Sequence, residues 1–299
     1  MALLSLLSLC RRKYSLRIAV AHVNHGLSKK QNDRHEALAR RFSSQAGIPF
    51  YSKSIRLKET ARKWKRSLEE TGRIERYRFF ETVAGKTRSH KIATAHTLDD
   101  QAETVLLRIS RGSGLRGIAG IPPKRTQGNF EIIRPLILCE KKDLIRFLTE
   151  EKIPFGVDKT NRRRAFTRNR VRFDLLPQME KNFNPQIKEA LASLGAASQS
   201  AMDYLERAAK KSFKRCVRSG VGKGTIRLAI PALRAFHPAI RREVIFLALF
   251  KKKGDLTQIG SHHIEAVIEM LSAADGKERE AHLPGPIIAC TRGRYLEFI

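Results

Sequence analysis

Three acidic side chains crowd the start of a predicted helix, residues 98–110, which directly follows a predicted buried strand. Thr97 and a single acid would be enough to cap this helix, but three acids follow: Asp99, Asp100 and Glu103. Glu103 lies three residues after Asp100 and four after Asp99, so its carboxylate is a neighbour of each on the helix surface and repels them. Clustered carboxylate oxygens bind cations and favour Mg²⁺. Asp100 and Glu103 are therefore candidate magnesium ligands.

A second polar group follows the predicted strand at 17–23. His22, Asn24 and His25 lie within the segment His-Val-Asn-His-Gly-Leu, where the strand ends. In open parallel sheets, ligands bind at the carboxyl ends of strands, so these side chains are candidates for substrate contacts. A polar loop with one buried histidine would give the same pattern.

A glycine-rich segment, 111–120, follows the acidic helix. Its four glycines allow a ligand to approach the backbone closely, and its arginines could meet phosphate. Arg111, Gly112 and Gly114 are the candidates here. A plain flexible loop remains the alternative.

Two basic stretches predict contacts with a polyanion. The first, 162–172, holds six arginines in eleven residues: Arg162, Arg163, Arg164, Arg168, Arg170 and Arg172. The second, 204–253, has fourteen Lys and Arg against two acidic residues and ends in Lys251, Lys252 and Lys253. A solvated surface is also basic, but an imbalance this large favours RNA or DNA phosphate. The aromatic content, 7%, is too low for base stacking to be the main mode of binding.

The overall composition agrees with a polyanionic partner. The 299 residues carry a net charge of +30, which predicts nucleic acid or an anionic membrane surface. No apolar run approaches the roughly 18 residues that span a bilayer, so we expect no transmembrane segment. The four cysteines lack the close spacing of a zinc site. We expect reduced thiols in a cytoplasmic protein rather than two long-range disulfides.

Short apolar segments alternate with helical patterns through the first part of the chain. Strands are predicted at 17–23, 51–55, 91–95 and 132–134, and helices at 31–46, 69–84, 98–110 and 140–151. This alternation predicts an α/β domain over residues 1–183, a Rossmann-like parallel sheet with helices on both faces. Residues 184–299 are predicted to form a smaller, mainly helical domain, with weaker strands near 225–230 and 286–298.

Six motifs occur in one order along the chain. They are His22-Val-Asn-His-Gly-Leu27, Arg76-Tyr77, Ala93-Thr-Ala-His-Thr-Leu-Asp-Asp-Gln-Ala-Glu-Thr104, Leu107-Arg-Ile-Ser-Arg-Gly-Ser-Gly114, Arg134-Pro-Leu136 and Arg168-Asn-Arg-Val-Arg172. Together they resemble the tRNA(Ile)-lysidine synthetases, a family of the N-type ATP pyrophosphatase (PP-loop) group. The resemblance is strong over about residues 1–185. The remainder resembles that family's tRNA-binding domain more loosely.

The resemblance implies a cytoplasmic carbon–nitrogen ligase that acts in two steps. ATP adenylates the C2 carbonyl oxygen of the wobble cytidine in a minor isoleucine tRNA. The ε-amine of L-lysine then attacks C2 and expels AMP. ATP, Mg²⁺, L-lysine and the anticodon loop of the tRNA would be the bound partners. The resemblance also leaves room for a homodimer.

The resemblance implies a role for each candidate residue by its motif position. Asp100, Glu103 and Arg170 would be catalytic, the two acids holding Mg²⁺ or orienting the lysine amine and Arg170 contacting phosphate or the activated base. The pocket would be lined by His22, Asn24, His25, His96, Asp99, Arg111, Gly112 and Gly114. Contacts with tRNA are expected from Arg162, Arg163, Arg164, Arg168, Arg172, Lys251, Lys252 and Lys253.

One part of the family pattern is absent from this sequence. The group binds pyrophosphate with a Ser-Gly-Gly-x-Asp-Ser loop between its first strand and first helix, whereas this sequence opens on a helix-like segment at Met1. A start codon assigned too late would explain the difference, and so would true loss of the loop. In the second case the chain would be a non-catalytic tRNA-binding protein. For the chain as given, we expect weak ATP binding and reduced stability.

Two other functions are less favoured by the sequence. A tRNA thiolase of the same fold group with redox chemistry would use paired cysteines, which this sequence lacks. A DNA-binding regulator would fit the charge, but no helix-turn-helix signal supports it.

Overall fold

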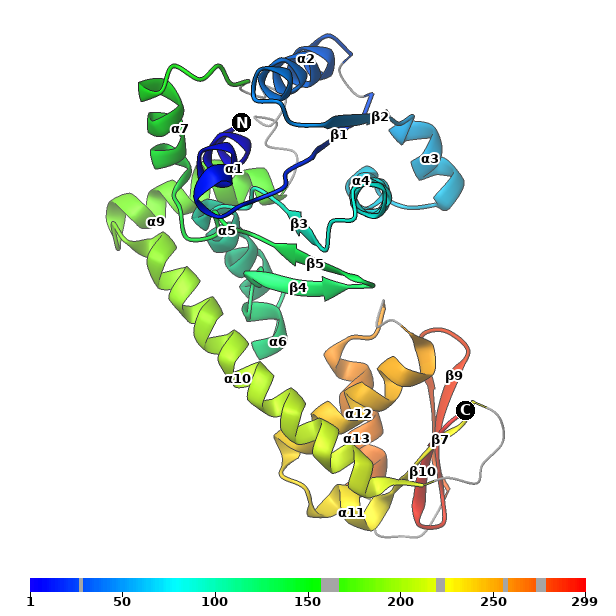
Figure 1. The fold of residues 1–299 in the computed structure, drawn as a ribbon. Coiled ribbons are helices and arrows are strands. Elements are labelled where there is room, and N and C mark those ends of the chain that lie inside the picture. Colours follow the sequence, from blue (N-terminus) through cyan, green and yellow to red (C-terminus); the bar gives the residue numbers. More distant parts are fainter. Residues whose placement is uncertain (27–28, 157–166, 219–223, 255–257, 273–277) are drawn as a thin grey trace. The chain divides into compact units, whose positions relative to one another are not determined.

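The computed structural model describes residues 1–26, 29–156, 167–218, 224–254, 258–272 and 278–299 (Figure 1). The chain divides into two compact units, unit 1 from Met1 to Ser198 and unit 2 from Gln199 to Ile299. The division lies inside helix α10 (Ile187–Cys216), which begins just after the predicted domain limit. Among the described residues, no helix is both long enough and apolar enough to cross a membrane.

Unit 1 contains two small sheets. In the first, β1 (Val20–Asn24) runs parallel to β2 (Phe50–Ser54). In the second, β3 (Lys91–Ala93) runs parallel to β5 (Phe130–Ile133), and β4 (Lys124–Gln127) pairs with β5 in the antiparallel direction. The parallel pairs and the helices between them confirm the predicted α/β class. The described strands form two sheets where one was expected.

Helices connect these strands. They are α1 (Ala2–Lys13), α2 (Lys29–Gln45), α3 (Leu57–Trp64), α4 (Leu68–Lys86), α5 (Leu98–Ile109), α6 (Leu115–Ile118), α7 (Lys141–Glu150), α8 (Thr167–Arg170), the π-helical turn η2 (Val171–Leu175) and α9 (Leu176–Asn182). Helices α1, α2, α4, α5 and α7 were predicted. Helix α3 was not, although Leu57, Ala61 and Trp64 recur at helical spacing.

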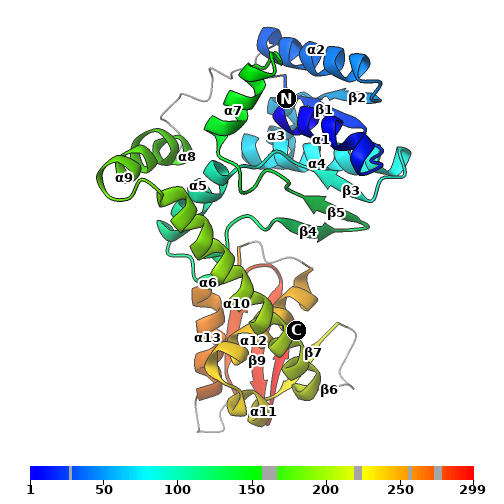
Figure 2. The ribbon, with the colours of Figure 1, turned by 60° about the vertical axis from the view of Figure 1, so that its left-hand side comes forward.

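Two apolar clusters hold unit 1 together. The first packs α4 against the second sheet through Ala84, Ile92 and Ile132. The second packs α5 against η2, α9 and the start of α10 and contains Ala102, Val105, Leu106, Val171, Leu176 and Leu191. Burial of this face of α5 holds its first turns beside α8 and η2 (Figure 2).

Unit 2 is a five-stranded antiparallel sheet packed against helices. The strand order is β6–β7–β10–β9–β8, with bounds Val217–Arg218, Ile226–Ala229, Tyr295–Phe298, Ile287–Arg292 and Glu280–Leu283. The helices are α11 (Ile230–Ala235), α12 (Pro238–Lys253) and α13 (Ser261–Ser272). Leu228, Leu296 and Phe298 lie fully buried on the sheet face that meets the helical core. The predicted strands near 225–230 and 286–298 are present as β7, β9 and β10.

Candidate functional site

Helix α5 begins at Thr97 with a reciprocal cap. The Asp100 backbone N–H donates to Thr97 Oγ1 (3.4 Å), and Asp100 Oδ2 accepts from the Thr97 backbone N–H (3.0 Å) and hydroxyl (3.1 Å). Capping of α5 therefore uses only one carboxylate oxygen, Asp100 Oδ2. Asp100 Oδ1, Asp99 and Glu103 are left for other contacts.

Glu103 is fully buried and is held by two arginines. Arg172 binds it as a bidentate fork, donating from Nε to Oε1 over 2.5 Å and from Nη2 to Oε2 over 2.9 Å. Arg168 Nε donates to Oε2 over 2.9 Å. A buried glutamate with this many charge-assisted bonds is expected to be tightly oriented.

Asp100 joins the same group through its second oxygen. Arg168 Nη2 lies 3.1 Å and Arg172 Nη2 3.4 Å from Asp100 Oδ1. We call Asp100, Glu103, Arg168 and Arg172 the carboxylate–arginine cluster. Its two negative and two positive charges balance. Burial alone would lower the pKa of Arg172, but Glu103 and the nearby aspartates raise that pKa above its usual value.

The cluster contains Arg168 and Arg172, whereas Arg170 was the arginine expected to be catalytic. The helical turn of α8 and η2 points Arg168 and Arg172, four residues apart, toward α5. Arg170 lies between them, is exposed and donates to Thr167 Oγ1 over 3.3 Å. Both cluster arginines were predicted to contact tRNA. The predicted tRNA contacts Arg162, Arg163 and Arg164 lie outside the described residues.

The predicted magnesium ligands are fully engaged by protein groups. Each oxygen of Asp100 and Glu103 accepts a bond from Thr97 or from an arginine. Within the described parts of the chain, no three His, Cys, Asp or Glu side chains converge as a metal site. The arrangement therefore does not fit a divalent cation unless an arginine leaves.

Asp99 belongs to a different group of charges. Its Oδ2 accepts the backbone N–H of Lys141 (2.7 Å), and its Oδ1 lies 3.5 Å from the ammonium of Lys188. Glu140 and Glu180 each lie 3.3 Å from the same ammonium. Successive helix residues point about 100° apart, which separates Asp99 from Asp100. The sequence held no signal for Lys188, because two of its three partners, Asp99 and Glu140, come from distant parts of the chain.

The histidine loop, residues 22–26, comprises the last residues of β1 and the bend that follows it. Asn24 is buried, donates to Asp33 Oδ1 (3.0 Å) and accepts the backbone N–H of Gly26 (3.1 Å), so its side chain fixes the loop. His22 stacks on Phe50 with ring centroids 6.3 Å apart. The Nδ1 atom of His25 is buried and has no hydrogen-bond partner among the described residues. Burial, together with Arg76 and His22, lowers the pKa of His25.

His96 connects this loop with the acidic helix. Its Nδ1 lies 2.9 Å from Thr94 Oγ1. Burial lowers the pKa of His96; Asp100 opposes this effect, whereas Arg134, Arg76 and Arg168 reinforce it. Arg76 acts on both His25 and His96, so the loops after β1 and β3 face one common region. His96 therefore lies near Asp100 and Arg168 of the carboxylate–arginine cluster, and Arg76 lies near both His96 and His25.

The glycine-rich segment lies elsewhere. Arg111, Gly112 and Gly114 follow the C-terminal end of α5, which is twelve residues or about 18 Å long, whereas Asp100 lies in its first turn. Gly112 has φ +68°, which reverses the chain after the helix, and Gly114 precedes α6. Arg108 holds this segment by donating to the carbonyls of Gly117 and Gly120. The structure therefore does not bring these three predicted pocket residues to Asp100.

The three predicted tRNA-contacting lysines lie in unit 2, in the last turn of α12. Lys251 is exposed and lies 5.8 Å from the ring centroid of Phe213, while Lys252 donates to the carbonyl of Gly224 (2.9 Å). Their charges also suit the negative end of the helix dipole.

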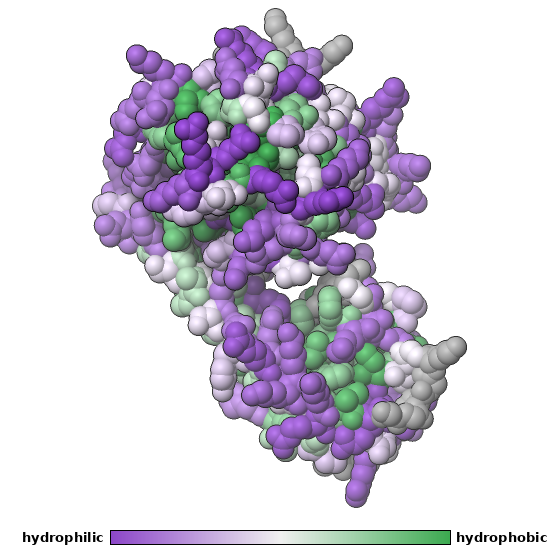
Figure 3. Space-filling model, viewed as in Figure 1, coloured by the Kyte–Doolittle hydropathy of each residue, from purple (hydrophilic) through white to green (hydrophobic). Residues whose placement is uncertain are grey.

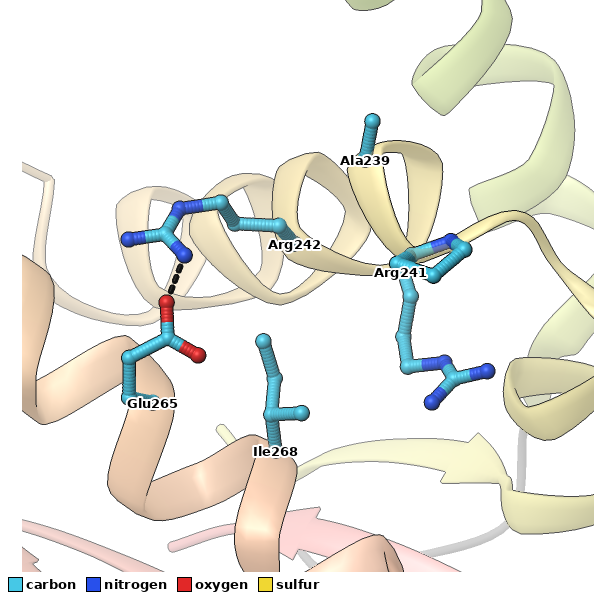
Figure 4. A pocket seen from close by; sticks show the side chains of 6 residues that line it. Ala239, Arg241, Arg242, Glu265 and Ile268 are labelled. Atoms are coloured by element: carbon cyan, nitrogen blue, oxygen red, sulfur yellow. Dashed lines mark ion pairs between the residues drawn. The ribbon is translucent and has the colours of Figure 1, made fainter. Parts of the chain in front are cut away.

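A separate pocket of about 230 Å³ lies between α12 and α13 (Figure 4). Arg242 and Glu265 form an ion pair at one side. Arg241, at the other side, donates to the carbonyls of Leu233, Arg234 and Phe236 and so holds the end of α11. None of the residues that line this pocket was predicted as a site residue.

Comparison with known proteins assigns both parts of the chain. A PP-loop domain model matches residues 1–179. The chain belongs to the PP-loop family. A second model, the TilS substrate binding domain, matches residues 228–295 within unit 2. Neither match favours the non-catalytic alternative or a DNA-binding regulator.

Several curated relatives share one name. The tRNA(Ile)-lysidine synthase of Clostridium acetobutylicum is 35% identical over 282 residues, which cover 92% of this chain and 59% of the relative. That of Solibacter usitatus is 33% identical, over 90% of this chain and 59% of the relative. The chain thus spans about three fifths of the length of these relatives.

Among solved structures, the U34-tRNA thiolase NcsA from Methanococcus maripaludis with its [4Fe-4S] cluster is similar in fold. The TM-score is 0.51 at 17% identity, over 66% of this chain and 68% of the thiolase chain. At this identity, the likeness concerns the fold alone.

Proposed function

We propose that the chain supplies the PP-loop and substrate-binding parts of a tRNA(Ile)-lysidine synthase. The observation that carries the proposal is the pair Asp100 and Glu103, held by arginines in the helix that follows β3 and close to His96. The enzyme would work in the cytoplasm and join L-lysine to C2 of the wobble cytidine of a minor isoleucine tRNA, using ATP. The resemblance also implies Mg²⁺ with the nucleotide.

The reaction consists of two group transfers and needs one proton acceptor. The cytidine O2 attacks the α-phosphate of ATP, and pyrophosphate leaves. The lysine nitrogen then attacks C2, and AMP leaves with O2. The lysine ammonium must lose a proton before it attacks, and Glu103 or Asp100 would hold it and accept that proton. The base must also leave the anticodon stack to reach these groups.

The balanced charges of the carboxylate–arginine cluster suggest how lysine is admitted. A lysine ammonium would be a third cation beside two carboxylates, so we expect it to displace one guanidinium. Arg168 is the candidate, because its side chain is 38% exposed against 25% for Arg172, and it does not form the two-oxygen fork. Once displaced, Arg168 would be free to contact phosphate, as would the exposed Arg170.

The histidines would form the other wall of the pocket. Their lowered pKa values keep His25 and His96 neutral near pH 7, so their rings can accept as well as donate hydrogen bonds. Within the part of the chain that the structure describes, the Nδ1 of His25 is buried without a hydrogen-bond partner, so it would bind a nucleotide or base only after the loop around it shifts. Unit 2 would add further contacts with the tRNA, with Lys251 among them.

Transfer of labelled lysine tests the proposal. The chain is incubated with radiolabelled lysine, ATP and a transcript of the minor isoleucine tRNA, and label in the RNA is measured together with AMP release. We expect one lysine per tRNA, and none when the wobble cytidine is replaced by uridine. Binding of the tRNA without incorporation of lysine would overturn the proposal and favour a non-catalytic RNA-binding protein.

A further inference from the structure

Helix α3, which the sequence motifs did not single out, begins at the edge where the candidate site lies. It directly follows β2, and the Ile55 backbone N–H donates to the carbonyl of Asn24 in the histidine loop (2.9 Å). Leu57 is buried, and its methyl groups and the His25 ring both lie about 3.5 Å from the place where Gly72 would carry a Cβ. The start of α3 therefore borders the His25 loop.

The outer face of α3 is positively charged and uncompensated. Lys58, Arg62, Lys63 and Lys65 are all exposed. In the described parts of the chain, none of these four side chains forms an ion pair, because Glu59 pairs with Arg56 and Glu70 with Arg66. Hydrophilic side chains project along the edge of unit 1 where Figure 1 draws α3 (Figure 3). Four free cations within eight residues form a compact anion-binding edge.

The backbone of Lys65 adds an independent observation. Lys65 ends α3 in the left-handed conformation, with φ +51°, where glycine is the favoured residue. The chain thus carries a charged side chain where glycine would relieve backbone strain. The helix dipole also favours a cation at this place, so the charge alone does not decide its purpose.

Arg88 provides a matched comparison within the same unit. It follows α4, is exposed, and has the same φ of +51°. Helix α4 begins next to Lys65 and is nineteen residues or about 28 Å long, so Arg88 lies at its other end. The two residues share charge, exposure, backbone conformation and dipole, and differ in their distance from the His25 loop.

We propose that the basic edge of α3, formed by Lys58, Arg62, Lys63 and Lys65, binds the phosphate backbone of RNA beside the candidate site. This inference rests on the proposed function, in which that RNA is the tRNA whose base enters the pocket. Cations at this edge hold the backbone next to the flipped base, because the start of α3 borders the His25 loop. The phosphate contacts carry no sequence information, so the edge supplies position and affinity rather than identity.

The chain contains a built-in reporter for this surface. Trp64 is the single tryptophan of the chain and lies between Lys63 and Lys65 in sequence. The Arg78 guanidinium lies over its ring, 4.9 Å from the ring centroid. RNA bound at α3 is therefore expected to change the tryptophan fluorescence.

The test compares tRNA affinity at stepped KCl concentrations. Changing all four cations of the edge to Gln is expected to lower the salt slope, log K against log [KCl], by about three units and to weaken binding roughly a hundredfold or more at 0.1 M KCl. Lys65→Gly is expected to weaken binding about threefold to tenfold, with thermal stability held or raised. Arg88→Gly should leave binding within about twofold of the parent chain, and RNA should change Trp64 fluorescence in the parent but not in the fourfold variant.

Four outcomes would overturn the proposal. Unchanged affinity and slope in the fourfold variant would place the RNA elsewhere, while lysine transfer by the parent chain would leave the proposed function standing. Equal losses for Lys65→Gly and Arg88→Gly would show a diffuse charge effect. Vesicles rich in phosphatidylserine that bind the parent chain more tightly than tRNA, and lose that binding in the fourfold variant, would assign the edge to a membrane surface. Failure of the parent chain to bind any tRNA would overturn the proposed function as well.

Discussion

Unit 1 and unit 2 each bury one glutamate among two arginines, but they build the arrangement differently. Glu103 in α5 is held by Arg168 and Arg172, which lie 65 and 69 residues further along the chain. Glu297 in β10 is 1% exposed and is held by Arg227 and Arg292 of the two neighbouring strands. The same residue types and nearly the same burial therefore occur in a candidate site and in a plain sheet.

The difference lies in what fixes the arginines. Arg227 stands directly opposite Glu297 in the register of β7 and β10, so main-chain hydrogen bonds determine its place. Its Nε and Nη2 atoms each lie 2.6 Å from the same oxygen of Glu297, Oε1. Arg172 instead engages both oxygens of Glu103 from a short π-helical turn, and Arg168 is shared with Asp100. The comparison teaches that a buried ion pair alone does not indicate catalysis; its place at the carboxyl end of a parallel strand does.

Replacing Glu103 is expected to have the largest effect. Glu103→Gln keeps the size of the side chain but removes the charge that would hold and deprotonate the lysine amine. We expect lysine transfer to fall at least about a thousandfold, with tRNA affinity within about threefold of the parent chain. Single-turnover incorporation of labelled lysine measures the first quantity, and filter binding the second. Transfer at an ordinary rate would remove Glu103 from the reaction.

The matched change in unit 2 is Glu297→Gln. It leaves Arg227 and Arg292 without their carboxylate, which we expect to lower the free energy of unfolding of unit 2 by about 3 kcal/mol, at the low end for a buried pair because both arginines reach solvent. Amide hydrogen exchange of β10 measures this loss. Once the sample is folded, lysine transfer per bound tRNA should be unchanged. A large loss of transfer in folded protein would contradict the distinction between the two glutamates.

The elements that position the site could be foreseen from the sequence, because they depend on local signals. A strand followed by a cap residue and acids predicted the start of α5, and the structure places that helix over Leu98–Ile109. The division into an α/β part and a second domain followed from the change in hydrophobic pattern near residue 184. Both are properties of short windows of sequence.

The partners of each side chain could not be foreseen in this way. Which of Arg168, Arg170 and Arg172 faces α5 depends on the phase of a short turn that mixes α and π geometry. Asp99 and Asp100 are adjacent and alike, yet Lys188 and Arg168 separate them through tertiary packing. Gly112 was read as a ligand contact, whereas its positive φ reverses the chain after α5. A single sequence shows which residue types are present, but not which way each side chain faces in the folded chain.

A smaller effect distinguishes the two arginine geometries. Arg172→Lys replaces a two-oxygen fork by a single ammonium, so one oxygen of Glu103 loses its partner and the carboxylate turns more freely. We expect lysine transfer to fall about tenfold to a hundredfold. Arg227→Lys keeps a cation at the one oxygen that Arg227 contacts, although it loses the stacking on Tyr295, and should leave transfer unchanged. Equal effects of the two changes on transfer would show that the fork geometry is unimportant.

The smallest expected effect is a pH dependence of the stability of unit 1. Burial lowers the pKa of His22, His25 and His96, so these rings take up protons in the unfolded chain before they do so in the folded one. As the pH falls through the ordinary histidine range near 6.5, the unfolded state binds more protons and the stability of unit 1 decreases; the decrease ends below the lowered pKa values. NMR titration of the ring Cε1 protons should place the midpoints of His25 and His96 below 6.5. His25→Gln and His96→Gln should each reduce the loss of stability between pH 7 and pH 5, measured by hydrogen exchange of β1 and β3. A midpoint above 6.5 for His96 would mean that Asp100 outweighs burial and the three arginines, and would recast the cluster as a site with an excess of negative charge.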